Sequence, residues 1–172
     1  MAILAIRVYP DPALRVKTPP VTDFGPALAR LAANMIETMV AAPGIGLAAP
    51  QVGSQARLAV VDLSVGDDPQ QLHVLVNPRI TRREGMETDV EGCLSLPGIS
   101  DKVDRPTSIT VRAQDLDGNA FELQAEEWLA RAICHEVDHL DGVLFTDHLR
   151  GLRRERVRRQ LRKLAAEQEV HA

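Results

Sequence analysis

The segment His135-Glu136-Val137-Asp138-His139 constrains the structure of this chain more than any other part of its sequence. Residues four apart lie on one face of an α-helix, so His135 and His139 can bind one metal ion when this segment is helical. The surrounding residues predict a helix over Glu126–Asp141, which Gly142 ends. The alternative is a solvated helix face that carries two histidines by chance.

Glu136 directly follows the first histidine, where its carboxylate can reach a metal-bound water without binding the metal. This arrangement suits metal-assisted hydrolysis, because the ion lowers the pKa of its water and the carboxylate takes and returns the proton. The segment therefore predicts a hydrolytic centre, provided that a third ligand lies elsewhere in the chain.

The third ligand does not follow the histidines at the spacing of the metzincin proteases. Gly142 is in place, but Phe145 stands where the third histidine should be, and His148 comes three residues too late. The remaining good ligand is Cys93, in the segment Glu91–Ser95. A thiolate with two imidazoles suits zinc or ferrous iron. We expect Cys93 to complete the site, the alternative being a small buried hydrophobic residue.

The second cysteine is not expected to bind the metal. Cys134 precedes His135 and lies about 100° around the helix from it, so we expect it to pack in the core. Two cysteines in 172 residues exclude a disulfide scaffold and indicate free thiols in the cytoplasm. The apolar stretch at the start of the chain is too short for the hydrophobic region of a signal peptide. The longest uncharged stretch of the chain contains prolines and glycines, so we expect no membrane span.

A glycine-rich segment, Gly44–Ala49, resembles a dinucleotide-binding loop only superficially. It follows a helical pattern, and Pro50 would interrupt the helix that such a loop should start. We interpret it as a segment without bulky side chains, which a substrate backbone can approach closely. Gln51 ends it with an amide that can donate to a developing oxyanion. The alternative is an ordinary loop.

The remaining patterns predict an α+β fold, with mixed or antiparallel sheets around a central metal-binding helix and a C-terminal helix. A mass of 18.8 kDa fits a single domain, residues 1–172. We expect further helices over Ala27–Val40 and Leu149–Gln168. We expect strands, each bounded by turn residues, over Arg57–Leu63, Leu72–Val76, Thr107–Ala113 and Ala120–Gln124.

The three chemical segments, Gly44–Gln51, Glu91–Ser95 and His135–His139, closely resemble in order and spacing the three motifs of the peptide deformylases. The opening Tyr9–Arg15 and the continuation Leu140-Asp141-Gly142 look similar too, so the resemblance covers nearly the whole chain. It implies an α+β enzyme that removes the formyl group from the N-terminal methionine of new polypeptides. It also implies one divalent metal ion per chain, natively Fe²⁺, with Zn²⁺, Ni²⁺ or Co²⁺ as substitutes.

Carried over residue by residue, the resemblance implies that Cys93, His135 and His139 bind the metal and that Glu136 is the general acid and base. One departure is visible, because Cys134 stands where the family often has glutamine. That position points away from the metal face, so we expect altered packing and unaltered chemistry.

The same resemblance assigns residues to the substrate. The Gln51 amide and the Leu94 backbone N–H would meet the oxyanion, and the main chain of Gly46 would hydrogen-bond the peptide. Arg105 is a candidate substrate contact, the alternative being a surface ion pair. We expect an apolar pocket for methionine, formed by residues that flank the motifs, such as Ile45, Trp128 and Ile133.

Positive charge is concentrated at the end of the chain. Residues 1–149 hold 12 Lys and Arg against 21 Asp and Glu, whereas residues 150–172 hold 8 against 3. Val157, Leu161 and Leu164 fall on one face of the expected helix, with arginines on the other. In related deformylases the C-terminal helix docks on the ribosome, so a ribosome contact is our hypothesis here, with a solvated helix face as the alternative.

Two other functions remain open on the sequence alone, a zinc endopeptidase and a metal-free ribosome-binding protein with a degenerate site. The expected partners are formyl-methionyl nascent peptides and the ribosome. We expect no DNA and no membrane partner.

Overall fold

The computed structural model describes residues 1–172 and contains two antiparallel sheets and three α-helices. The larger sheet has the strand order β1-β2-β3-β6-β7, and β4 and β5 form a separate two-stranded ribbon. The strands are β1 (Gly46–Ala48), β2 (Leu58–Asp62), β3 (Leu72–Glu84), β4 (Glu87–Gly92), β5 (Ser100–Arg105), β6 (Ser108–Gln114) and β7 (Ala120–Glu126). The helices are α1 (Pro26–Ala41), α2 (Glu127–Leu140) and α3 (Gly151–His171), with short 3-10 turns at η1 (Pro12–Arg15), η2 (Ala49–Val52), η3 (Pro69–Gln71) and η4 (Phe145–His148).

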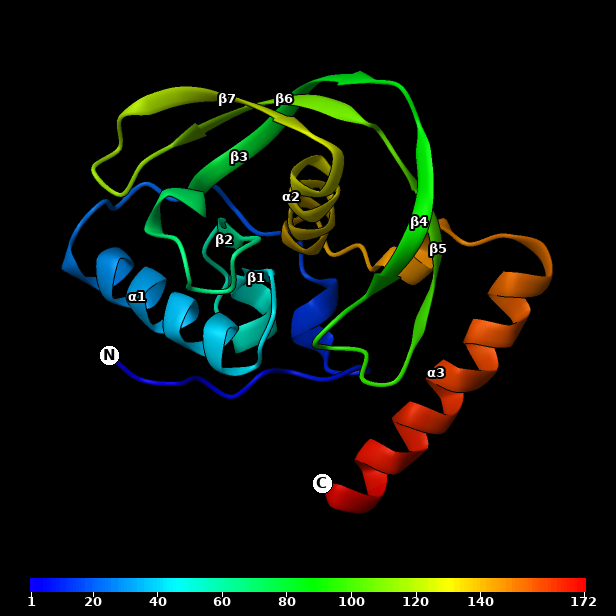
Figure 1. Ribbon diagram of the computed structural model, residues 1–172. Coiled ribbons are helices and arrows are strands. Elements are labelled where there is room, and N and C mark those ends of the chain that lie inside the picture. Colours follow the sequence, from blue (N-terminus) through cyan, green and yellow to red (C-terminus); the bar gives the residue numbers. More distant parts are fainter.

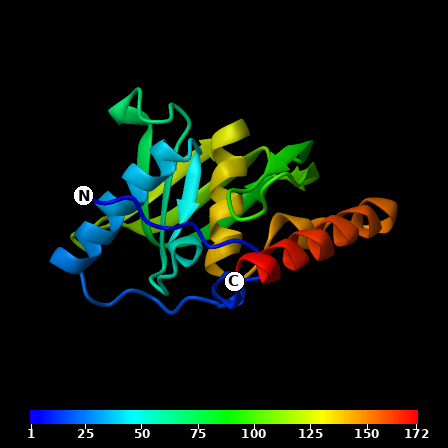
Figure 2. The ribbon, with the colours of Figure 1, turned by 90° about the horizontal axis from the view of Figure 1, so that it is seen from below.

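Helix α2 lies at the centre of the molecule, between the larger sheet and ribbon β4–β5, as Figure 1 shows. Ala130, Ile133, Cys134 and Val137 recur along it at three- and four-residue spacing and pack against the buried side chains of the larger sheet. The view from below in Figure 2 shows α2 running through the middle of the molecule, with ribbon β4–β5 on one side of it. The opposite face of α2 therefore meets the ribbon.

Two further cores fix the outer helices. Leu28, Met35 and Met39 of α1 are buried against Leu58 and Val60 of β2. This core also contains Leu47 of β1 and Ala49 of η2, and both of these elements contact α2, so the core holds them in place. None of the three helices combines the length and the apolarity that a membrane crossing requires.

Helix α3 packs against the body through the apolar face of its middle turns, and its first turns lie at the edge of the molecule (Figure 1). Val157 and Leu164 are buried and Leu161 is partly buried in a core near the ribbon, as the spacing predicts. The Arg156 guanidinium also donates to the Asp101 carboxylate at 2.5 Å. The arginines of the other face are exposed.

The predicted α+β class is confirmed, and the predicted helices and strands each match an observed element. The strand expected over Leu72–Val76 continues to Glu84, and β1, β4 and β5 are not predicted at all. In β5 the inward-pointing residues are Asp101, Val103 and Arg105, two of them charged. The alternation of apolar and polar residues that marks a half-buried strand is therefore absent there.

Candidate metal centre

The three predicted ligands meet at one point. Cys93 Sγ lies 3.3 Å from His139 Nε2, which lies 3.2 Å from His135 Nε2, and all three ligand atoms fall within 4.8 Å of one another. A tetrahedral ion with bonds of about 2.0–2.3 Å holds its ligand atoms about 3.3–3.6 Å apart. One thiolate and two imidazoles at this separation fit a single divalent ion such as zinc or ferrous iron.

Two elements bring these ligands together. Helix α2 supplies both histidines from one face, with ring centroids 4.9 Å apart. Cys93 begins the loop that follows β4, so the ribbon carries the thiol to the helix. Phe145, which excludes the metzincin pattern, is buried and stacks on the His135 ring at 6.0 Å. It is a wall of the site and not a ligand.

Glu91 holds His135 in the orientation that metal binding needs. His135 Nδ1 lies 2.9 Å from Glu91 Oε1, so this nitrogen donates and leaves Nε2 free for the ion. Glu91 also accepts from Arg105 and from Arg131. Burial opposes its ionisation, but the hydrogen bonds from Arg105 and His135 outweigh burial and lower the pKa of Glu91 to about 2. The residue is a fixed anion behind the metal ligand.

Glu91 belongs to the segment Glu91–Ser95, but the sequence alone predicts no role for it. The only signal for Glu91 was its position two residues before Cys93, and without a predicted strand this spacing does not indicate a shared face. Its partners were not predictable, since Arg105, Arg131 and His135 lie 14 to 44 residues away.

The expected substrate contact of Arg105 is not supported by the structure. Arg105 is 5% exposed and does not line the cavity described below. Its guanidinium donates to both oxygens of Glu91, at 2.8 and 2.9 Å, and to Asp138 at 2.7 Å. The surface ion pair considered as the alternative is wrong as well, because the pair is buried. Arg105 acts on the site through Glu91.

Glu136 points into the site without a partner. The residue is 4% exposed, and its Oε2 atom is buried with no hydrogen bond. A β-carbon at Gly46 would lie 2.5 Å from Glu136 Oε1, so the glycine at this position makes room for the carboxylate. Burial raises the pKa of Glu136 to about 7. A carboxyl group of this kind can both accept and return a proton near neutral pH.

Gln51 and Leu94 both present hydrogen-bond donors near Cys93. Gln51 Oε1 accepts from the Ala48 N–H at 2.9 Å, which turns the side-chain amide nitrogen toward the metal ligands. That nitrogen lies 3.1 Å from Ser95 Oγ and 3.7 Å from Cys93 Sγ. The Leu94 backbone N–H makes no hydrogen bond within the protein.

A cavity of about 390 Å³ opens onto these groups. Most of the predicted substrate residues line it, namely Ile45, Gly46, Gln51, Leu94 and Trp128. Ile133 does not, because it is fully buried against the sheet, so its predicted place in the pocket is wrong. Arg131 and Ala132 line the cavity instead. Cys134 packs in the core as expected, and burial raises the pKa of its thiol to about 11.

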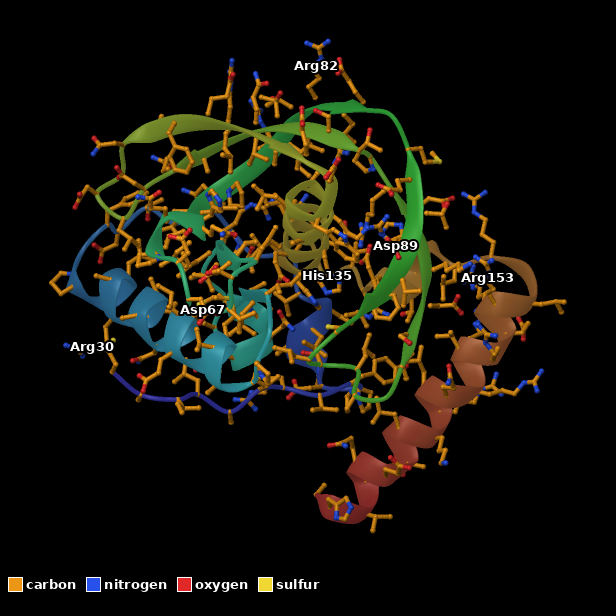
Figure 3. All side chains as sticks on the ribbon, viewed as in Figure 1. Arg30, Asp67, Arg82, Asp89, His135 and Arg153 are labelled. Atoms are coloured by element: carbon orange, nitrogen blue, oxygen red, sulfur yellow. The ribbon has the colours of Figure 1, made fainter.

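The site lies deep inside the molecule. In Figure 3 the labelled His135 lies near the centre, among α2, the larger sheet and ribbon β4–β5, whereas Arg30, Arg82 and Arg153 point outward at the periphery. Solvent and substrate therefore reach the ligands through the cavity, at whose mouth Trp128 is 48% exposed.

Comparisons with known proteins agree with this arrangement. Residues 3–155 match the model of a family described as Polypeptide deformylase. The chain is 51% identical over 164 residues to a peptide deformylase of Acidobacterium capsulatum, covering 95% of this chain and 96% of that one. Among solved structures, peptide deformylases from Legionella pneumophila and Thermus thermophilus are 42% and 43% identical, each with a TM-score of 0.89. The first likeness covers 98% of both chains, and the second covers 96% of this chain and 99% of the other. Nothing in these comparisons supports an endopeptidase.

Proposed function

Since this chain belongs to the polypeptide deformylase family and is a hydrolase that removes the formyl group from nascent polypeptides, we propose that Cys93, His135 and His139 hold its metal ion. The observation that carries this assignment is the convergence of the three ligand atoms within 4.8 Å beside an unpartnered, buried carboxylate, Glu136. The native ion in this proposal is Fe²⁺, as the likeness to the family implies. Zn²⁺, Ni²⁺ or Co²⁺ can substitute for it, because one thiolate and two imidazoles accept each of these ions. A bound divalent ion supplies Lewis acidity toward water and toward the formyl oxygen.

Glu136 moves the proton in this mechanism. Its carboxylate takes a proton from the attacking water, whose oxygen adds to the formyl carbon. As the carbon–nitrogen bond breaks, Glu136 returns the proton to the leaving amine, so that formate and a free amino group result. A pKa of about 7, raised by burial, suits a group that must do both.

Gln51 and Leu94 stabilise the negative charge that develops on the formyl oxygen. The Gln51 amide nitrogen is held by the bond between its own oxygen and the Ala48 N–H, so it needs little reorganisation during the reaction. The Leu94 N–H is free to donate. Both groups lie beside Cys93, one of the residues that would hold the ion.

The peptide is positioned by β1. This strand is at the edge of the larger sheet and pairs on one side only, with β2. A formyl peptide can therefore lie along its free edge, with the main chain of Gly46 as the hydrogen-bonding partner and Ile45 beside the first side chain. Gly46 lines the cavity directly above Glu136, which brings the formyl group to the carboxylate.

Helix α3 carries the proposed ribosome contact. Its outer face exposes Arg158, Arg159, Arg162 and Lys163, and Arg158 alone of these has an acidic neighbour, Glu155 at 3.7 Å. A polyanion such as ribosomal RNA suits this face, and the enzyme would act in the cytoplasm as one catalytic domain. Replacing the four residues with glutamine should abolish salt-dependent cosedimentation with ribosomes and spare activity on short peptides. Ribosome binding that is unchanged and independent of salt would contradict the contact.

Formate release is the direct test of the proposed site. The enzyme is purified without oxygen, its metal content is measured, and the same sample is given a formyl-methionyl peptide. We expect formate in proportion to bound metal and no cleavage of internal peptide bonds in an unformylated protein. Activity in metal-free protein would contradict the proposed ligands.

A further inference from the structure

One wall of the substrate cavity is polar. Arg131 borders the cavity three residues after Trp128 on α2, whereas Ile133, predicted for the same pocket, lies in the core. Arg131 is only 5% exposed, so its guanidinium group is part of the interior and not of the molecular surface. A side chain that enters the cavity therefore meets an arginine.

The guanidinium group of Arg131 is held rigidly and has a donor to spare. Nη1 donates to Glu91 Oε2 at 2.7 Å and to the Val103 carbonyl at 2.8 Å, and Nη2 donates to the Glu87 carbonyl at 2.8 Å. The Nε–H makes no hydrogen bond within the protein, and Nε is not one of the fully buried polar atoms that lack a partner. This N–H has no partner within the protein, on a residue that lines the cavity, so it can serve an acceptor from outside.

The charge of Arg131 is balanced by the groups behind the wall. Arg131 and Arg105 both pair with Glu91, and Arg105 pairs also with Asp138, so two cations face two anions. A carboxylate at this wall would lose its hydration without gaining an uncompensated counter-charge from Arg131. A neutral hydrogen-bond acceptor would gain the Nε–H and lose little.

The shape of the cavity favours an unbranched side chain. The Arg131 guanidinium carbon lies 5.8 Å from the centroid of the Trp128 ring, so arginine and ring form adjacent walls. Ala132, the next lining residue, contributes only a methyl group. A flexible, unbranched chain can lie along these walls with its end at the guanidinium group.

We propose that Arg131 determines specificity, and that the cavity accepts formyl peptides whose first side chain is unbranched and ends in a neutral acceptor, such as methionine sulfoxide. The sulfoxide has the length of methionine, and its oxygen accepts hydrogen bonds far better than a thioether sulfur does. The reaction is the same hydrolysis, in which water adds to the formyl carbon, formate leaves and the sulfoxide oxygen is unchanged. This inference rests on the deformylase site proposed above.

The test compares two peptides that differ only in the first side chain, formyl-methionine sulfoxide and formyl-norleucine. Norleucine has a similar length and no acceptor. The ratio of the two kcat/KM values is measured on one enzyme sample, so loss of metal or of folded protein cancels. For the wild type we expect the sulfoxide peptide within about tenfold of the norleucine peptide, since its oxygen is not left unpaired.

Two variants identify the residue responsible. R131M keeps the length of the side chain and removes the donor, so the ratio should fall by about tenfold or more. R105M is the matched control, because it removes the other arginine from Glu91 without altering the cavity wall. We expect its ratio to equal that of the wild type, whatever happens to total activity.

Three outcomes overturn the inference: an unchanged ratio in R131M, an equal fall in R105M, or a wild type that disfavours the sulfoxide by more than about tenfold. The wild-type ratio needs no variant, so the inference can be contradicted even when R131M does not fold. Failure to release formate from formyl-methionyl or formyl-norleucine peptides is a different result, because it contradicts the proposed function itself.

Discussion

The two faces of helix α2 are built from opposite kinds of side chain. The face toward the larger sheet carries Ala130, Ile133 and Val137, which are buried among apolar neighbours. The face toward ribbon β4–β5 carries His135, whose partner Glu91 is bound by two arginines. The sheet face is held by apolar packing, which is not directional. The ribbon face is held by hydrogen bonds, which fix the positions of individual atoms.

The sheet face of α2 mainly contributes to the stability of the fold, whereas the ribbon face mainly orients the proposed metal site. Burial of apolar surface stabilises the fold roughly in proportion to area. Buried ion pairs add little net stability, because desolvation offsets their attraction, yet removing one partner is costly since the others remain charged and buried. We therefore expect changes on the sheet face to lower stability alone, and changes on the ribbon face to affect the metal as well.

The largest loss of stability is expected for Glu91→Ala. It leaves Arg105 and Arg131 buried without their shared anion, which should lower the free energy of unfolding by about 3–5 kcal/mol. It also frees the His135 ring, so metal affinity should fall by about 10–100-fold. Urea unfolding and metal analysis measure the two effects. Glu87→Ala, an exposed position on the same strand, is the control and should change neither.

Ile133→Ala tests the opposite face. The side chain is fully buried, so the cavity left behind should lower the free energy of unfolding by about 3 kcal/mol. Metal content and kcat should remain those of the wild type at temperatures where the variant is folded. A variant that loses its metal while still folded would show that the two faces are not independent.

The two cysteines allow the same comparison with one residue on each side of α2. Cys134→Ala removes one buried sulfur from the sheet face, and we expect a loss of about 1–2 kcal/mol with the metal retained. Cys93→Ala removes a proposed ligand, so bound metal should be lost. Metal analysis of both proteins after the same purification decides the matter, and equal metal content in the two would contradict the ligand assignment.

The smallest effect concerns Asp101, an inward-pointing acid of the ribbon. Burial opposes its ionisation, but the hydrogen bonds from Arg156 and from the Lys102 N–H outweigh burial and lower the pKa of Asp101. Its contribution to stability is therefore complete above the ordinary carboxyl pKa of about 4 and is lost as the pH falls through the lowered value. Asp101→Asn should flatten the decline of stability below that pH, measured by urea unfolding, whereas Asp104→Asn on the exposed face of β5 should not.

The same comparison explains what the sequence could reveal. The metal-binding face of α2 and its apolar face were predictable, because both depend on spacings of three and four residues within one helix. Ile133 was assigned to the wrong side since one residue turns a helix by about 100°, and flanking a motif does not specify a direction.

The ribbon was not predictable from local patterns. Asp101 and Arg105 point inward on β5, and Arg131 meets Glu91 across 40 residues of sequence. A buried charge leaves no periodic signal, because its partner is chosen by the fold and not by spacing along the chain. The support of His135, the burial of Arg105 and the polar wall at Arg131 all depend on such pairs.

Glu136→Gln tests most directly whether Glu136 moves the proton at the metal centre that Cys93, His135 and His139 form. Glutamine has the same shape but cannot take the proton, so kcat for formate release should fall by about 10²–10⁴-fold with metal content unchanged. Both quantities are measured on the same anaerobic sample. A variant that keeps its metal and turns over formyl-methionyl peptide at nearly the wild-type rate would contradict the account.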